Sequence, residues 1–296
     1  MPEGDTVWRQ ARNLHRALTG RTVHHTSFRF PDSAEIDLAG ETIHGAFARG
    51  KHLFIRIGSM SVHSHLKMEG IWHVYGTDNA GKPARWKRRT TEARAVIKAN
   101  ARLDSSGVVR DGSSPVEAVG FNLGMLDVVP TENEERFVSH LGPDILGADW
   151  NLAQAVENIR KRPERMIGPA LLDQKNLAGI GTIYRAETLF LAGVDPRSTV
   201  AAVPDLPRVV EIASLLLNAN RARPLRVTRT VAEPLWVYGR RRQNCYRCTS
   251  PIVREELSDQ GTDGERFGIT PHRLAQENDI ARLSYRCPTC QVLFRE

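Results

Sequence analysis

The chain has 296 residues, of which 41% are hydrophobic and 25% are charged, and its formal net charge is +7. A chain of this length can bury one large core or two to three smaller ones, so we expect a folded, globular protein. No run approaches the ~18 to 20 apolar residues of a membrane span, and the first 20 residues are amphipathic and charged. We therefore expect a cytoplasmic protein with no membrane partner.

The chain starts with Pro2 and Glu3 after Met1. Once Met1 is removed, as we expect, Pro2 presents a secondary amine next to a carboxylate. An α-amino group titrates at ~7.7 to 8 and a lysine at ~10.4, so the terminal amine is far more often uncharged at neutral pH. The pair is therefore a candidate Schiff-base nucleophile with a proton donor beside it. Taken alone, the dipeptide is more typical of a solvated chain end.

Residues 1–130 predict one helix followed by a two-layer β domain. The helix is expected to be capped by Asp5 and ended by Gly20, because apolar residues recur there at helical spacing: Val7, Ala11, Leu14 and Leu18. The later segments alternate apolar and polar residues with period two between Gly, Ser, Asn and Asp, which is typical of strands. The expected strands are 41–48, 52–57, 61–66, 71–75, 94–99 and 119–129.

Beyond Pro130 the apolar period becomes three to four residues, which predicts helices. The expected helices are 132–140, 152–160, 168–175, 182–192 and 206–219, with Gly193 closing one of them and Pro204 preceding another. A third region begins near Trp236 and contains all four cysteines. We therefore expect a multidomain α+β protein with an N-terminal β-sandwich and flanking helices (1–130), a helical domain (131–235) and a cysteine module (236–296).

A glycine turn joins two of the expected helices at 171–184. Gly179 and Gly181 let the backbone turn tightly and approach a ligand closely. The free N–H groups at the start of the second helix attract anions, and a phosphate is the natural guest. The segment is neither a P-loop nor a dinucleotide fingerprint, so a helical hairpin without a ligand remains the alternative.

Positive charge is concentrated in residues 221–247, which contain eight arginines and a single acidic residue, Glu233. Such a local concentration of positive charge indicates an acidic partner, and nucleic acid is the leading candidate. A solvated charged face is the alternative.

The four cysteines form two pairs with the same two-residue gap, Cys245 with Cys248 and Cys287 with Cys290. This spacing is typical of a tetrahedral zinc site with four thiolate ligands. Four protein ligands fill the coordination sphere, so the Zn²⁺ would be structural. Two disulfides are the alternative, but we identify no secretory signal in the sequence.

Several separated motifs together resemble the formamidopyrimidine-DNA glycosylase and endonuclease VIII family of bifunctional DNA glycosylases, and in particular its actinobacterial endonuclease VIII branch. The resemblance covers nearly the whole chain. It rests on the Pro-Glu-Gly start and on segments 49–53, 65–70, 171–184 and 237–240, the last leading into the cysteines. The resemblance implies that the glycine turn belongs to a helix-two-turns-helix domain and the cysteines to a zinc finger.

The resemblance also implies a reaction and its catalytic residues. In this family the N-terminal proline amine, here Pro2, attacks C1′ of a damaged nucleotide, expels the base and forms a Schiff base. β- and δ-elimination then cut the strand. Glu3 would move protons during ring opening, and Lys51 would hold a phosphate and assist elimination. Arg282, five residues before Cys287, would clamp phosphates from the tip of the finger.

DNA contacts follow from the same resemblance. The target base must leave the duplex, and Met68 would fill the gap it leaves. His65 matches a phosphate contact, and we also expect Asn176, Gly181 and Thr182 to contact DNA. A place in the core is the alternative for both Met68 and His65. The expected partner is DNA containing oxidised bases or abasic sites, bound by a monomer associated with the nucleoid.

The chain departs from the family pattern at several positions. Thr182 stands where the family usually has asparagine, and Thr6 stands where it has an acidic residue, with Asp5 adjacent. The segment 121–124 lacks the arginine of the guanine-directed branch, which favours oxidised pyrimidines. Between Cys248 and Cys287 lie 38 residues, about twice the family's usual spacing, and the surplus is expected within 259–279.

Two other functions remain open from the sequence. A catalytically silent protein that binds damaged DNA on the same scaffold would fit the departures at Thr6, Thr182 and the long insert. The Pro2, Glu3 and Lys51 set argues against it, because binding alone needs no terminal amine beside a carboxylate. A zinc-ribbon RNA-binding protein is the third candidate, and it would neither cut DNA strands nor prefer damaged duplexes.

Overall fold

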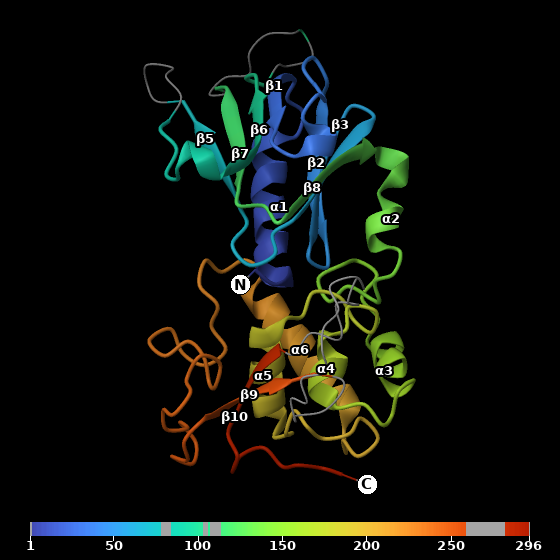
Figure 1. The fold of residues 1–296 in the computed structure, drawn as a ribbon, viewed down its shortest axis with the longest axis vertical. Coiled ribbons are helices and arrows are strands. Elements are labelled where there is room, and N and C mark those ends of the chain that lie inside the picture. The colour runs from blue at the N-terminus through green and yellow to red at the C-terminus, as the bar shows by residue number, and fades with distance from the viewer. Residues whose placement is uncertain (1, 78–83, 103–105, 107–113, 259–281, 296) are drawn as a thin grey trace. The chain divides into compact units, whose positions relative to one another are not determined.

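The computed structural model describes residues 2–77, 84–102, 106, 114–258 and 282–295 (Figure 1). These residues form two compact units, Met1–Ser139 and His140–Glu296. The first holds two β-sheets around a helix, and the second holds a helical core and a four-cysteine cluster. The expected α+β architecture is thereby confirmed, while the three-part division of the chain stays a prediction. No helix in the described residues is long and apolar enough to cross a membrane.

The first unit contains two four-stranded antiparallel sheets. One sheet has the strand order β1 (Val23–Phe28), β6 (Ala93–Ala99), β7 (Val116–Phe121) and β5 (Ile71–Gly76). The other has the order β2 (Ile43–Arg49), β3 (His52–Ile57), β4 (Met60–His65) and β8 (Met125–Pro130). Short helices η1 (Pro31–Ser33), η2 (Thr90–Glu92), η3 (Thr131–Asn133) and α2 (Glu135–Val138) complete the unit. Apolar residues of both sheets share one core, which is the sandwich expected from the alternation.

Helix α1 (Gly4–Leu18) lies against both sheets of this unit (Figure 1). Its stripe of Val7, Ala11, Leu14 and Leu18 is buried in the core. The capping residue is Glu3, whose carbonyl accepts the N–H groups of Thr6 and Val7. The prediction that Asp5 caps the helix is therefore wrong, because the helix begins at Gly4, two residues earlier than a cap at Asp5 implies, and so includes Asp5.

Two strand predictions differ from the structure. The expected strand 119–129 is two strands, β7 and β8, because Asn122 adopts a left-handed conformation with a φ of 47° that a continuous strand does not contain. Strand β1 was not expected, because its two exposed histidines, His24 and His25, break the alternation.

The second unit contains helices α3 (Leu152–Arg160), α4 (Ile167–Leu172), α5 (Thr182–Ala192) and α6 (Leu206–Asn220). Each side chain of α5 from Thr182 to Phe190 is buried, so this helix forms the centre of the unit. Gly193 ends α5 with a φ of 71°, which a glycine adopts at little cost. Strands β9 (Val253–Leu257) and β10 (Arg282–Arg286) pair with each other.

Some helices in this region have the expected bounds and others are shorter than expected. The expected bounds of α3 and α5 are confirmed, whereas the expected helix 132–140 is reduced to η3 and the single turn of α2. The expected helix 168–175 ends at Leu172, because Asp173 has an extended backbone. The surplus segment expected within 259–279 lies outside the described residues.

Candidate functional site

Pro2 and Glu3 lie at the start of α1. Glu3 is fully buried, and Pro2 immediately before it is half-buried. Glu3 has an extended backbone and is the N-terminal capping residue of the helix. The N–H groups and the dipole at this end of a helix favour a negative charge. Thr6 donates its hydroxyl to the carboxylate of Asp5 over 3.3 Å, so a second buried carboxylate lies in the same turn. A terminal amine at Pro2 would thus be next to a buried carboxylate at the start of a helix.

Lys51 lies in the tight turn between β2 and β3. Arg49 and His52 are cross-strand partners, and Gly50 between them has a φ of 57°. The turn therefore presents Lys51 at the end of the sheet rather than within a strand. This placement agrees with the expected phosphate contact, which stays a prediction.

His65 precedes the turn after β4, and Met68 lies within that turn. His65 is the last residue of β4, and Gly70 donates its N–H to the carbonyl of Leu66 over 2.9 Å. A Cβ at Gly70 would lie 2.5 Å from that carbonyl oxygen, so the turn requires glycine. Met68 lies within the turn with 59% of its surface exposed. The core alternative for Met68 is therefore wrong.

His65 is held as a neutral ring. Its Nδ1 accepts the N–H of Lys67 over 3.0 Å. Burial, together with the charges of His52, Lys67 and Lys51, lowers the pKa of His65 to about 3. The ring can therefore offer a neutral Nε2–H donor to a phosphate but adds no positive charge at neutral pH.

We expect Met68→Ala to reduce the preference for DNA with an abasic site over intact DNA, because a wedge is used only when a base leaves the stack. The dependence of log affinity on log salt should stay the same, because no charge is removed. Binding titrations at several salt concentrations measure both quantities. Leu215→Ala, which truncates another exposed apolar side chain, is the control. An unchanged preference in the Met68 variant would remove Met68 from the wedge.

The turn between α4 and α5 is braced by one side chain. Gln174 accepts the N–H of Gly179 over 3.0 Å and donates to the carbonyls of Leu172 and Ile180. Gly179 has a φ of 104°, so the need for glycine there is confirmed. The result is a rigid approach to the N-terminus of α5.

Three residues of this turn were expected to contact DNA. Gly181 is the capping residue of α5, and Thr182 is the first helical residue with 6% of its surface exposed. Asn176 donates its side-chain amide to the carbonyl of Ala170 over 2.9 Å, so it also stabilises the turn. Their roles toward DNA stay predictions.

Arg282 is the first residue of β10 and pairs with Leu257 of β9. The next residue, Leu283, accepts a hydrogen bond from Nη2 of the fully buried Arg185 over 2.5 Å. Arg185 belongs to the first turns of α5. One buried guanidinium therefore connects the strand that carries Arg282 to the helix that starts at Thr182.

We expect Arg282→Ala to flatten the dependence of log affinity on log salt by about one unit, because one neutralised phosphate contributes roughly that much. Intact and damaged DNA should be weakened alike. Arg208→Ala, which removes an arginine already paired with Glu211, is the control. If Arg282→Ala changes neither slope nor affinity, the finger does not place this residue on DNA.

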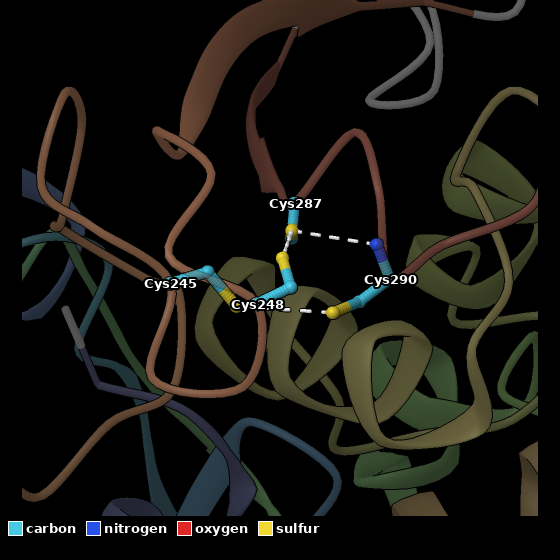
Figure 2. Close-up of side chains that lie close together, drawn as sticks. All are labelled: Cys245, Cys248, Cys287 and Cys290. Carbon is cyan, nitrogen blue, oxygen red and sulfur yellow. Dashed lines mark hydrogen bonds between the residues drawn. The ribbon is translucent and has the colours of Figure 1, made fainter.

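The four cysteines converge on one point (Figure 2). Their sulfur atoms all lie within 4.8 Å of one another, with 3.9 Å between Cys245 and Cys290 and 3.4 Å between Cys248 and Cys287. The thiols are free, so the disulfide alternative is not supported. Backbone N–H groups of Arg247 and Cys290 donate to Cys245 and Cys287 respectively. The cluster could hold one metal ion with tetrahedral thiolate ligands.

Glu187 was not singled out from the sequence. It is fully buried in α5, and its carboxylate accepts the N–H groups of Trp236, Val237 and Tyr238 over 2.8 to 2.9 Å. Thr228 donates its hydroxyl to the same carboxylate. The acid thus fixes the chain that leads into the cysteine module. An acidic residue within a mostly apolar helix was the available signal.

The arginine-rich segment is partly structural. The guanidinium groups of Arg229 and Arg240 stack on Tyr246, at 3.8 and 3.5 Å from the ring centroid. Arg240 also donates to the carbonyls of Trp236 and Asn244. Arg241, Arg242 and Arg247 are exposed. Only part of the positive charge is therefore presented to a partner.

Comparison with known proteins identifies the family. Residues 1–109 match the N-terminal domain of formamidopyrimidine-DNA glycosylase, and residues 141–213 match the H2TH domain of the same protein. The chain is 41% identical over 298 residues to a probable endonuclease 8 2 of Streptomyces coelicolor, covering 99% of this chain and 94% of that protein. The chain belongs to the formamidopyrimidine-DNA glycosylase family.

Further relatives lie in the same branch of this family. Endonuclease 8 2 of Mycobacterium tuberculosis is 39% identical, covering 98% of this chain and 100% of that protein. A DNA-(apurinic or apyrimidinic site) lyase Nei2 of Mycolicibacterium smegmatis is 37% identical, covering 99% of each. The family and branch expected from the sequence are confirmed, and with them the expected class of enzyme.

The fold agrees with solved structures of the formamidopyrimidine-DNA glycosylase family. A crystal structure of the Lactococcus lactis enzyme bound non-covalently to DNA with an AP site superposes with a TM-score of 0.70 at 21% identity, covering 98% of this chain and 99% of that one. The match to the N-terminal domain includes Pro2, Glu3, Lys51, His65 and Met68. The H2TH match includes Asn176, Gly181 and Thr182, whereas Arg282 and the four cysteines lie beyond it.

Proposed function

We propose that this family member is a bifunctional DNA glycosylase and AP lyase of base excision repair that excises oxidised bases, with pyrimidines favoured. The observation that carries the proposal is the fully buried Glu3 at the N-terminus of α1, directly after Pro2. A buried carboxylate beside a chain-end amine serves proton transfer, whereas DNA binding alone has no use for it. The relatives named endonuclease 8 and AP lyase support the same chemistry.

In the proposed reaction the Pro2 amine, freed by removal of Met1, attacks C1′ of the damaged nucleotide. The bond from C1′ to the base breaks, and the base leaves with the bonding electrons and takes up a proton. Glu3 donates a proton to the sugar ring oxygen as the ring opens, which leaves an iminium between Pro2 and C1′. Elimination of the 3′ and then the 5′ phosphate cuts the strand.

The remaining predicted residues would hold DNA around this reaction. Lys51 and Arg282 would bind phosphates, His65 would donate from its neutral ring, and Met68 would fill the vacated stack. The turn at Asn176, Gly181 and Thr182 would bind a phosphate at the N-terminus of α5. Pyrimidine preference rests on the segment 121–124, which lacks an arginine. We propose that the enzyme acts as a monomer in the cytoplasm, associated with the nucleoid.

We propose that the four-cysteine cluster holds Zn²⁺ with a structural role. Tetrahedral thiolates at the usual Zn–S distance of about 2.3 Å have sulfur atoms ~3.8 Å apart. The sulfur distances of 3.4 and 3.9 Å fit this geometry. Zn²⁺ bound to four thiolates leaves no open position for catalysis, so it would stabilise the finger only.

Sodium borohydride trapping on DNA with an abasic site tests the proposed function. The reagent reduces the iminium to a stable amine, so the enzyme should become covalently joined to DNA through Pro2. Intact-mass measurement of the adduct gives the modified residue. A trapped adduct formed by protein that retains Met1 would falsify the role of Pro2. Strong binding to abasic DNA without adduct or strand cleavage would instead favour the silent DNA-binding protein.

A further inference from the structure

A chain of polar side chains crosses the sheet that carries Lys51. His63 Nδ1 lies 3.1 Å from a carboxylate oxygen of Asp127, and His63 Nε2 lies 2.9 Å from His52 Nδ1. The three residues come from β8, β4 and β3, which are neighbours in the sheet. None of them was selected from the sequence, and the proposed reaction does not use them.

The strand register explains why these residues meet. Asp127 is the cross-strand partner of His63, Phe54 is the partner of His63 on the other side, and His52 is the partner of His65. Residues two apart on a strand lie on the same face, so all of these side chains share one face of the sheet. Leu53, Ile55 and Val62 on the opposite face belong to the main core.

The ring of His63 is buried and held between aromatic side chains. Its side chain has no exposed surface, and the ring of Phe137 from α2 stacks on it with centroids 4.0 Å apart. Phe54 packs against it with centroids 4.9 Å apart. A buried imidazole in this setting can satisfy its two nitrogen atoms only through the two hydrogen bonds described above.

The carboxylate dictates where the protons lie. An ionised Asp127 can only accept, so His63 must donate from Nδ1. Burial lowers the pKa of His63, the hydrogen bond and charge of Asp127 oppose this effect, and Arg136 of α2 adds to it. At neutral pH the ring is therefore uncharged, and its Nε2 accepts a hydrogen bond from the Nδ1–H of His52. Both histidines then carry a hydrogen on Nδ1.

The chain of hydrogen bonds ends beside the proposed catalytic lysine. His52 follows Lys51 directly, and its cross-strand partner Arg49 lies on the other side of the turn. The rings of His52 and His65 make an edge contact with centroids 5.2 Å apart, and the positive charge of Lys51 contributes to the lowered pKa of His65. A neutral His65 avoids a further positive charge beside Lys51 and Lys67.

We propose that Asp127, His63 and His52 form a positioning relay that fixes the ring and tautomer of His52 and thereby the turn that carries Lys51. The relay does not touch DNA and acts through Lys51, so its contribution to strand cleavage rests on the proposed function. The hydrogen-bond pattern of the relay is independent of the proposed function. Asp127 fixes the orientation and tautomer of His63, and His63 in turn fixes those of His52.

The test is a measurement of histidine tautomers by ¹⁵N NMR on protein labelled at histidine and free of DNA. In the unmodified chain we expect Nδ1–H on His52 and His63, and Nε2–H on His65. In Asp127→Asn the amide can donate to His63 Nδ1, so both His52 and His63 should change to Nε2–H. Asp32→Asn, which removes an exposed carboxylate of the same unit, should leave all three unchanged.

Strand cleavage provides the second readout. In single-turnover assays on abasic DNA, Asp127→Asn should cleave at least ~10-fold more slowly, because a small misplacement of a catalytic group is costly. Its affinity for intact duplex should change less than about twofold, since no phosphate contact is lost. His63→Phe keeps the aromatic stack and removes both hydrogen bonds, so it should lose cleavage to a similar degree.

Two outcomes would overturn the relay. One is Nε2–H on His63 in the unmodified protein, which needs no variant to fold. The other is unchanged cleavage in Asp127→Asn with reversed tautomers. If the unmodified protein neither cleaves nor is trapped on abasic DNA, the proposed function fails instead, and the tautomer measurement still decides the hydrogen-bond pattern.

Discussion

Replacing Glu3 with glutamine is expected to slow base excision by ~10² to 10⁴-fold, which is the usual contribution of a positioned acid or base. The substitution preserves the shape of the side chain and its place at the start of α1, but it removes the proton that ring opening requires. Glu3 is fully buried, so water cannot readily replace that proton. Single-turnover excision from a duplex with one oxidised pyrimidine measures the rate.

The same variant should bind abasic DNA with nearly unchanged affinity, because a buried side chain contributes no phosphate contact. Glu35→Gln, an exposed glutamate of the same unit, is the matched control and should excise normally. Excision at the original rate in Glu3→Gln would exclude Glu3 from the mechanism. Loss of binding together with excision would instead show that the substitution disturbs α1.

Removing the metal is expected to abolish DNA affinity while leaving the first unit folded. The cysteines contribute to a small core with Phe190, Val237 and Tyr285, so the finger has few other apolar contacts to hold it. Structural zinc contributes about 10–16 kcal/mol to the folding of finger peptides at neutral pH. Without it, β9 and β10 and the strand position of Arg282 should be lost.

Metal analysis should find one zinc per chain, and Cys245→Ser should lose it. Amide hydrogen exchange measured by mass spectrometry should show protection lost in the finger and retained in β2, β3, β4 and β8. A chelator applied to the unmodified protein should reproduce the effect, and added Zn²⁺ should reverse it. Full DNA affinity in the metal-free protein would contradict a structural role for zinc in binding.

Most of the fold could be predicted from local sequence patterns. The bounds of β3, α3 and α5 agree with those expected from apolar spacing and from ending residues such as Gly193, which closes α5. The split between β7 and β8 was missed, although asparagine is a residue type that adopts a left-handed backbone more often than most, as Asn122 does here. The start of α1 was placed too late, since a glutamate without a side-chain capping bond is not a typical helix cap.

The candidate site was predictable only where residues are close in sequence or match a family motif. Pro2 with Glu3 and the paired cysteines are of this kind. The Asp127, His63 and His52 contact depends on the register of three strands, and two of its members are 64 residues apart. No periodicity specifies which strands are neighbours. The alternation of His63 and His65 along β4 was the single visible signal.

The bonds that hold the finger to α5 limit how this protein can be recombined with others. Glu187 binds the backbone of residues 236–238, and Gln291 next to the last cysteine donates to the carbonyl of Val194 just beyond the helix. The finger therefore completes its backbone hydrogen bonds with groups from outside its own sequence. A chimera that exchanges only residues 236–296 would leave those groups unmatched, whereas one that also exchanges 182–198 would keep the bonded groups together.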